Sequence, residues 1–282
     1  KGGVKEFDDM SGTLTENALS QQSKLLAKDG SVIATPYDEN RIVVPSSAIP
    51  KVMKDAQVAI EDERFYDHGA LDQRGILRAV AANLVSSSTQ GASTLTQQYV
   101  KVAAQRAAIE SGDKEEAKKA VAQHGTDAYV RKIKQLKMAV ELEKTHTKDQ
   151  ILTSYLNLVF FGDGTYGIEA ASQHYFGHPA KDLTLPEAAT LAGVVNLPGS
   201  TDPVHNPKAA VKRRNIVLEK MIKQGRVSKA DGEKAIASPL QTHVTNIAGG
   251  GGCQGSKYPY FCDYVTDWVA DQPALGANRK ER

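Results

Sequence analysis

Apolar residues recur at intervals of three and four after Pro50, and this helical period most constrains the fold of the chain. The first run continues through Ile60 and predicts a helix that ends at Glu61. Further helical, apolar or Ala-rich patterns follow, over residues 75–85, 94–104, 130–144, 149–158, 185–195 and 207–224. The sequence therefore predicts a mainly α-helical fold class.

One β signal precedes these helices. Alternating apolar residues on both sides of Asp29 and Gly30 predict two short strands joined by a tight turn. We therefore expect a small β-hairpin near the N-terminus.

The composition allows one sizeable core and narrows the range of partners. The chain has 282 residues, of which 40% are hydrophobic, enough for one core or one core with an appendage. A net charge of +2 gives no reason to expect a nucleic-acid partner. No apolar run approaches the roughly eighteen residues of a membrane span, and no signal-peptide pattern opens the chain. Because the chain begins at Lys1, we expect a membrane anchor to precede residues 1–22.

The two cysteines, Cys253 and Cys262, flank eight residues near the C-terminus. A short loop of this kind has little core of its own, which favours a disulfide over the alternative of two free thiols. A disulfide would indicate an extracytoplasmic setting. Two cysteines without a nearby histidine do not suit a zinc site.

The stretch IEDERFYDHGALD crowds acidic side chains at the end of the first predicted helix. Glu61 ends the apolar run and is followed directly by two more acidic residues. Burial and neighbouring like charges disfavour an ionised carboxylate, which would suit Glu61 to general acid–base chemistry. The simpler alternative is a solvated helix end, and a third is a metal site at Asp67 and His68.

A second stretch, QGASTLTQQYVK, has the pattern of a helix start. Thr94 and Gln97 have the capping-box spacing, so we expect a helix to begin at Ser93 or Thr94. The free N–H groups at a helix start attract phosphate, and Lys101 adds a positive charge two turns along. An ordinary capped helix without a ligand is the alternative.

A third stretch, RKIKQLKMAVELEK, places four cations within seven residues, at Arg131, Lys132, Lys134 and Lys137. They could form an ordinary solvated face or a cradle for a multiply charged anion. Together the three stretches indicate a carboxylate base that faces a diphosphate site. Glycosyl transfer from a diphosphate donor requires that arrangement.

Five ordered stretches resemble the motifs of the peptidoglycan glycosyltransferase domain of class A penicillin-binding proteins. They are EDERFYDHGALD, QGASTLTQQ, RKIKQLKMAVELE, ILTSYLNLVFFGDGTYGIEAASQHYFG and LTLPEAATLAGVVNLPGSTDPVHNPKAAVKRRNIVLEKM. The resemblance covers residues 23–245. Within them, 105–126 form a polar insertion that we expect to be a solvated helical segment or a mobile loop.

The resemblance implies a lysozyme-like, mainly α-helical domain on the outer face of the bacterial cytoplasmic membrane. Such a domain polymerises lipid II into glycan strands with inversion and releases undecaprenyl diphosphate. Glu61 would take the proton from the acceptor hydroxyl. The matching positions imply a substrate-binding set of Phe65, His68, Ser93, Gln97, Gln98, Lys101, Arg131, Lys132 and Lys134.

The chain departs from the family at Gln135, where a second catalytic glutamate is usual. That glutamate is thought to help position a metal or the basic groups, so the departure affects the leaving-group step. A diphosphate-contacting arginine usual before the third motif also has no match, and Arg106 is a candidate replacement. The cofactor implied is a divalent cation, magnesium or manganese, with no organic cofactor.

The resemblance also implies partners and neighbours. The partners are lipid II, the growing glycan chain and moenomycin-type inhibitors. Membrane lipid would contact the upstream anchor and the apolar segment Gly75–Val85. The alternative for this segment is that it is part of the core. Residues 246–282 resemble a Gly-rich linker and the start of a transpeptidase region, with an actinobacterial character. Ser111 and Lys114 fit Ser-x-x-Lys by spacing alone and Lys-Thr-Gly is absent, so no transpeptidase activity is expected.

Two other functions remain as alternatives. A lysozyme-like lytic enzyme would use its glutamate to cleave glycan, but neutral glycan gives the basic third motif nothing to neutralise. A scaffold without activity is suggested by Gln135. The retained Glu61, Ser93, Gln98 and Lys101 argue against that reading.

Overall fold

Helices dominate the computed structural model, which describes residues 12–71, 93–122, 124–244, 253 and 256–276. The helices are α2 (Lys51–Glu61), α4 (Leu95–Glu110), α5 (Lys114–Val121), α6 (Gly125–Thr145), α7 (Lys148–Leu158), α8 (Ile168–Phe176), α9 (Leu185–Val194), α10 (Pro198–Thr201), α11 (Pro207–Lys223), α12 (Lys229–Ala237) and α13 (Pro259–Ala270). Short 3-10 turns occur at Ser46–Ala48, Ala180–Asp182 and Pro273–Leu275. The predicted mainly α-helical fold class is confirmed.

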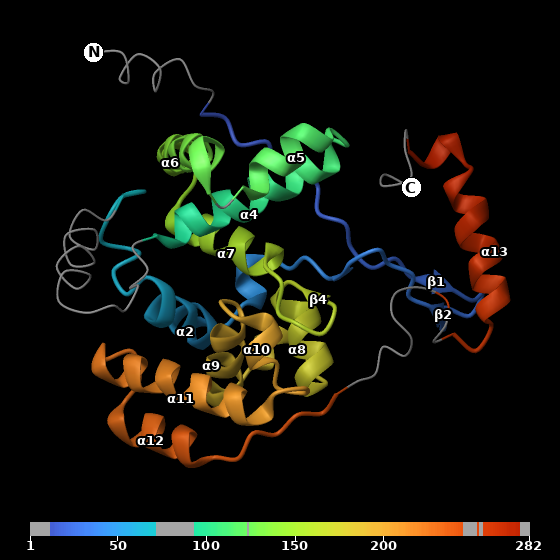
Figure 1. Cartoon of the computed structure of the whole chain (residues 1–282). Coiled ribbons are helices and arrows are strands. Elements are labelled where there is room, and N and C mark those ends of the chain that lie inside the picture. The colour runs from blue at the N-terminus through green and yellow to red at the C-terminus, as the bar shows by residue number, and fades with distance from the viewer. Residues whose placement is uncertain (1–11, 72–92, 123, 245–252, 254–255, 277–282) are drawn as a thin grey trace.

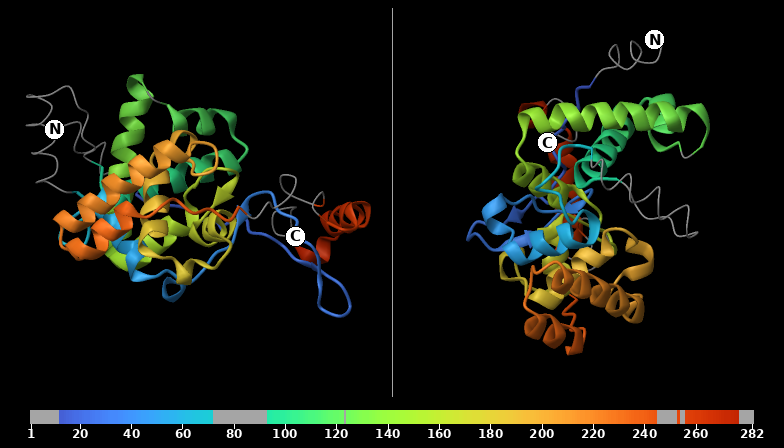
Figure 2. Two further views of the ribbon diagram at one scale, coloured as in Figure 1. Left: turned by 90° about the horizontal axis from the view of Figure 1, so that it is seen from below. Right: turned by 90° about the vertical axis from the view of Figure 1, so that its left-hand side faces the viewer.

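The helices of the body pack in two groups. In one, α4 lies against α5, α6 and α7, and in the other, α9 lies against α2 and α11. Figure 1 and the right view of Figure 2 show α6 at one end of the molecule and α12 at the other. A helix that is apolar on all sides belongs in a core, and α9 is buried continuously from Ala188 to Val194. Its alanines let α2 and α11 approach closely.

The predicted hairpin is present near the N-terminus. Strands β1 (Leu25–Leu26) and β2 (Val32–Ala34) pair antiparallel, and Gly30 supplies the positive φ of 83° in the turn. A second, parallel pair was not predicted, because β3 (Asn40–Arg41) and β4 (Thr165–Tyr166) lie far apart in the sequence. Two residues are too few to carry a strand pattern.

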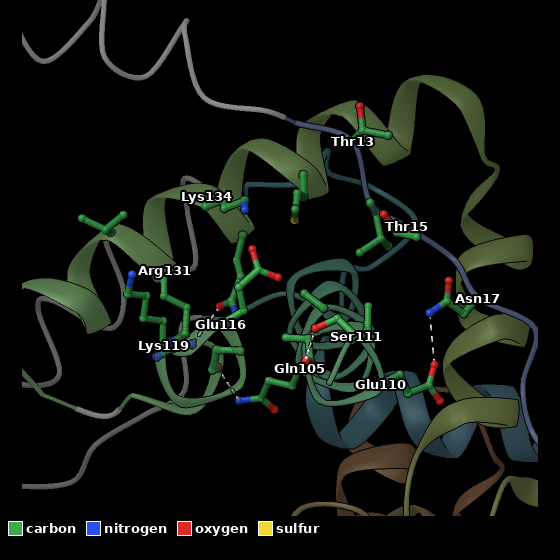
Figure 3. A pocket seen from close by; sticks show the side chains of 18 of the residues that line it. Thr13, Thr15, Asn17, Gln105, Glu110, Ser111, Glu116, Lys119, Arg131 and Lys134 are labelled. Atoms are coloured by element: carbon green, nitrogen blue, oxygen red, sulfur yellow. Dashed lines mark hydrogen bonds between the residues drawn. The ribbon is translucent and has the colours of Figure 1, made fainter. Parts of the chain in front are cut away.

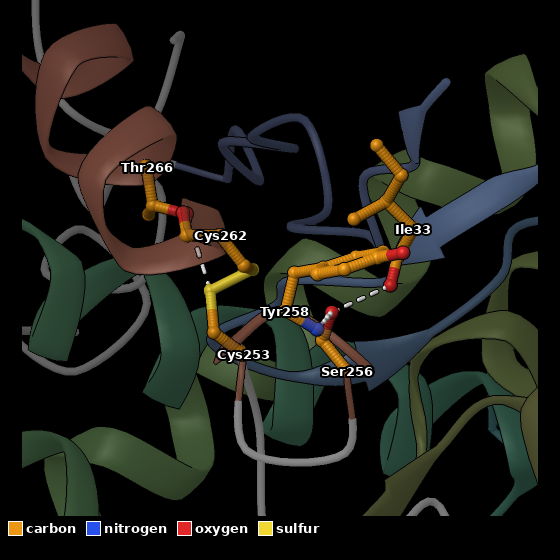
Figure 4. Close-up of a disulfide and its surroundings, with 6 residues drawn as sticks. All are labelled: Ile33, Cys253, Ser256, Tyr258, Cys262 and Thr266. Carbon is orange, nitrogen blue, oxygen red and sulfur yellow. Dashed lines mark hydrogen bonds between the residues drawn. A yellow bond between two sulfur atoms is a disulfide. The ribbon is translucent and has the colours of Figure 1, made fainter. Parts of the chain in front are cut away.

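The C-terminal helix returns to this hairpin. Cys253 and Cys262 form a disulfide, and both pack against Ala34 of β2. The Ser256 hydroxyl donates a hydrogen bond to the Ile33 carbonyl at 2.7 Å (Figure 4). These contacts attach α13 to the N-terminal strands, at the side of the helical body (Figure 1).

The polar insertion, predicted as helical or mobile, is mostly helical over its described residues, with a turn at 111–113. It contains the end of α4 and all of α5, whose N-cap Asp113 accepts hydrogen bonds from the N–H groups of Glu115 and Glu116. The Ser111 hydroxyl donates to the Ala108 carbonyl at the end of α4. The spacing match to Ser-x-x-Lys is therefore a turn between two helices.

Among the helices that the structure describes, none combines the length and the apolar character needed to cross a membrane. The apolar segment Gly75–Val85, for which lipid contact is expected, lies outside the described residues.

Candidate active site

The site begins at the last residue of α2, where Glu61 is half-buried. Carbonyl groups at a helix end lack partners within the helix, and cations near them are favourable. Lys220 donates to the Ile60 carbonyl at 3.1 Å, and Gln224 donates to the Ala59 carbonyl at 3.0 Å. Side chains of the fifth motif and of the turn after it therefore fix the end of the helix that carries Glu61.

Two other side chains hold the carboxylate of Glu61. Gln98 Nε2 donates to Glu61 Oε2 at 2.9 Å, and the Tyr155 hydroxyl donates to Gln98 Oε1 at 3.1 Å. Burial, with the charge of Glu61, raises the pKa of the Tyr155 hydroxyl well above its ordinary value, so this group remains a donor. Within the described residues, Glu61 Oε1 and both amide atoms of Gln57, one helical turn earlier, are buried without a hydrogen-bond partner. We refer to Glu61, Gln98 and Tyr155 as the carboxylate group.

Asp62 makes structural contacts that differ from those of Glu61. Its Oδ2 accepts the Leu95 N–H at 3.1 Å, and its Oδ1 lies 2.7 Å from Nε2 of His68. Asp62 is buried, whereas Glu63 is exposed. The crowded acidic residues thus separate in space, and Asp62 joins the end of α2 to the start of α4.

The predicted start of α4 is confirmed, but only half of the capping box forms. Thr94 is the N-cap, and its hydroxyl accepts the Gln97 N–H at 3.2 Å. The Gln97 side chain donates instead to the Ala70 carbonyl at 2.8 Å. Because Asp62 and Thr94 already occupy the N–H groups of Leu95 and Gln97, an anion here would be held mainly by side chains.

Two of the predicted residues, Ser93 and Lys132, are in contact beside this helix start. Lys132 Nζ donates to the Ser93 hydroxyl at 3.1 Å. Partial burial lowers the pKa of Lys132, and the positive charges of Arg131 and Lys101 lower it further. Lys101 therefore lies close enough for repulsion, and we refer to Ser93, Lys101 and Lys132 as the cation group.

The other cations of the third stretch face elsewhere. Arg131, Lys134 and Gln135 line a cavity of about 700 Å³ between α4, α5, α6 and the segment around Thr13 (Figure 3). Gln135 Oε1 accepts from Arg131 Nη1 at 3.0 Å, and Arg131 Nε donates to the Ala122 carbonyl. Lys132 instead contacts Ser93, beside the start of α4. The third stretch therefore makes two separate sets of contacts.

Several predicted site residues support the site from within the fold. Phe65 is fully buried, with the Lys148 ammonium 4.5 Å from its ring centre, so it does not offer a ligand-facing surface in this structure. Arg106, the candidate replacement for a missing arginine, instead pairs with Glu39 and Glu110. It is thus already neutralised at another part of α4.

The sequence reasoning missed Tyr155, Lys220 and Gln224. Tyr155 lies on an amphipathic helix, where a tyrosine is normally an ordinary core residue. Its position within the fourth motif was the one signal that could have drawn attention to it.

The cation group does not suit a divalent metal ion, because its side chains end in two amines and one hydroxyl. Magnesium and manganese prefer carboxylate oxygens. Within the described residues, Asp163, Asp202 and His205 have ligand atoms within 4.8 Å of one another, and they lie on other elements. Asp202 already accepts the N–H groups of Val204 and His205. This group could hold an ion only in competition with those bonds.

The comparisons with known proteins agree on a family. Residues 29–222 match the family model described as Transglycosylase. Penicillin-binding protein 1A of Streptococcus pneumoniae is 34% identical over 262 residues, which are 92% of this chain and 34% of that protein. Penicillin-binding protein 1A of Mycobacterium tuberculosis is 39% identical over 214 residues, which are 75% of this chain and 24% of that protein.

Two further matches complete the comparison. A Cupriavidus necator protein described as a transglycosylase is 38% identical over 198 residues, which are 70% of this chain and 78% of that protein. The crystal structure of penicillin-binding protein 1A from Haemophilus influenzae aligns with a TM-score of 0.45 and 22% identity, over 90% of this chain and 24% of that one.

The chain belongs to the transglycosylase family. It is homologous to the glycosyltransferase region of penicillin-binding proteins such as 1A and 1F, and it spans about a third or less of their length.

Proposed function

We propose that this domain polymerises lipid II into peptidoglycan glycan strands by inverting glycosyl transfer. One observation carries the proposal: α4 connects a hydrogen-bonded carboxylate to a set of cations. Gln98 holds Glu61, and Lys101 lies three residues further along the same helix, where its charge lowers the pKa of Lys132. A base for the acceptor and positive charge for a diphosphate leaving group are the two requirements of this reaction.

In the proposed reaction, Glu61 takes the proton from the 4-hydroxyl of the acceptor sugar. The acceptor oxygen then forms a bond to C1 of the donor sugar from the side opposite the diphosphate. The bond between C1 and the phosphate oxygen breaks, its electron pair remains on the diphosphate, and the configuration at C1 inverts. General base catalysis of this kind contributes about 10²–10⁴ in rate.

The cation group would stabilise the leaving undecaprenyl diphosphate. Lys101 and Lys132 repel each other while no anion lies between them, so an anion that binds there relieves repulsion as well as gaining attraction. The residues of the neighbouring cavity would contribute less to stabilising the diphosphate; they are Arg131, Lys134 and Gln135.

A divalent cation would most simply arrive with the diphosphate, because the cation group offers no carboxylate. The membrane location at the extracytoplasmic face, lipid contact and moenomycin-type inhibition belong to the same proposal. Their support is the family membership and the similarity to penicillin-binding proteins.

The test is polymerisation of labelled lipid II, with magnesium, with manganese and with neither. We expect glycan strands from the wild type and a loss of at least 100-fold in Glu61→Gln. Glu63→Gln is the matched control, since it makes the same chemical change at an exposed neighbour and should retain activity.

Two results would contradict the proposal. One is a folded wild type that makes no glycan in any metal condition, including when tested with an upstream membrane anchor. The other is release of fragments from existing glycan, which would identify the lytic alternative.

A further inference from the structure

A buried tyrosine lies directly behind the bond between Gln98 and Glu61. Tyr155 of α7 is only 2% exposed, and its hydroxyl donates to Gln98 Oε1 at 3.1 Å. Gln98 in turn donates to Glu61 Oε2 at 2.9 Å. Side chains from α7, α4 and α2 therefore form one continuous series of hydrogen bonds that ends at the carboxylate.

The amide of Gln98 can take two orientations that differ by half a turn. In the observed one, the NH₂ group faces Glu61 and the carbonyl oxygen faces Tyr155. In the reversed one, the carbonyl oxygen would face the carboxylate, so that two acceptors oppose each other. The proton of the buried tyrosine would also lose its acceptor, and a buried donor without a partner is costly. Tyr155 thus selects one orientation of the amide.

The hydroxyl of Tyr155 keeps its proton under working conditions. Burial raises the pKa of this group, and the negative charge of Glu61 raises it further. The group therefore remains a donor across the pH range in which a glycosyltransferase would be assayed.

We propose that Tyr155 is a positioning residue, which acts through Gln98 to hold the carboxylate of Glu61 in the orientation that accepts the proton. This inference rests on the proposed function, because it requires Glu61 to be the base. Tyr155 touches neither sugar nor diphosphate in this scheme. Its effect should fall on kcat and leave KM unchanged, since substrate contacts are not altered.

The test compares two buried tyrosines in the lipid II assay. Tyr155→Phe keeps the ring and removes the hydroxyl. Tyr175→Phe is the matched control, because Tyr175 is also buried and its hydroxyl donates to the Phe161 carbonyl at 2.9 Å and to Asp202. Both variants lose a buried hydrogen bond, so both should show a lowered unfolding temperature.

Only Tyr155→Phe should alter catalysis. We expect its kcat to fall about tenfold with KM unchanged, as for the loss of a hydrogen bond that orients a charged group. Tyr175→Phe should retain the wild-type kcat.

A double-mutant cycle separates action through Gln98 from a direct effect. If Tyr155 acts through Gln98, adding Tyr155→Phe to Gln98→Ala should lower kcat by less than about twofold further. A full additional tenfold loss, or a wild-type kcat in Tyr155→Phe alone, would overturn the inference while leaving the proposed function intact. An inactive wild type would overturn the proposed function, and this inference with it.

Discussion

The carboxylate group and the cation group each include one residue of α4 but are built in opposite ways. In the carboxylate group, neutral amide and hydroxyl donors hold Glu61, and Asp62 next to it also has its partners. In the cation group, Lys132 has one hydroxyl partner and lies near two like charges. Apart from Glu61 Oε1, which has no partner among the described residues, the first region is satisfied by the fold, and the second is left in repulsion.

The difference follows from what each region has to do in the proposed reaction. A base must present one oxygen in one direction, so fixed donors are useful before any substrate arrives. A diphosphate site must gain free energy from an incoming anion, so prior neutralisation by carboxylates would weaken it. Changes in the satisfied region should therefore lower stability as well as activity, whereas changes in the repelling region should lower activity with little effect on stability.

The largest effect on stability should come from the satisfied region. Asp62→Ala removes the acceptor of the Leu95 N–H and the partner of His68, so we expect the free energy of unfolding to fall by about 2–3 kcal/mol. Glu63→Ala, at the exposed neighbour, should stay within about 0.5 kcal/mol of the wild type. Denaturant unfolding measures both. Equal losses of stability in Asp62→Ala and Glu63→Ala would show that the contacts of Asp62 do not stabilise the fold.

The cation group should show the reverse pattern. Lys132→Met should lower kcat/KM about 10- to 100-fold by removing a charge from the diphosphate site. The same change should raise the stability slightly, by a few tenths of a kcal/mol, because solvent screens this largely exposed repulsion. A destabilised Lys132→Met would show that the lysine serves the fold instead.

The small gain in stability should depend on pH. The pKa of Lys132 is lower in the folded state than in the unfolded state, so the fold disfavours the charged form. Below the folded pKa, this preference lowers the free energy of unfolding by its full amount. As the pH rises through the folded pKa toward the unfolded value of about 10.4, this cost is relieved. The stability difference between Lys132→Met and wild type should accordingly be largest near neutral pH and shrink above pH 10. Unfolding curves at several pH values measure it.

The smallest effect should come from the residue that departs from the family pattern. Gln135 lines the cavity and accepts a hydrogen bond from Arg131, whereas Lys132 contacts Ser93. Gln135→Glu should therefore form a local ion pair with Arg131, which already donates to this side chain, and change kcat/KM by less than about threefold. A rise of more than tenfold in the lipid II assay would show that position 135 acts together with Lys132 on the leaving group.

The helices and the hairpin could be predicted because each depends on local chemistry. The period of three and four over α2, the Thr94 cap of α4 and the Asp29–Gly30 turn are all encoded within a few residues. The parallel pairing of β3 and β4 could not be predicted, since it joins residues more than a hundred positions apart. The same limit applies to α13, whose attachment to the hairpin joins the two ends of the chain.

For the site, the residue types and their spacing supplied the candidates: Glu61 at a helix end, Gln98 and Lys101 on the next helix, and cations on a third. The contacts of these candidates came from the packing of the helices. It directed Asp62 to the start of α4, gave Lys132 and Gln135 different partners, and placed Tyr155 behind Gln98. The physical reason is that residue type and spacing fix the helix face on which a side chain lies. The partner it meets depends on how the helices pack.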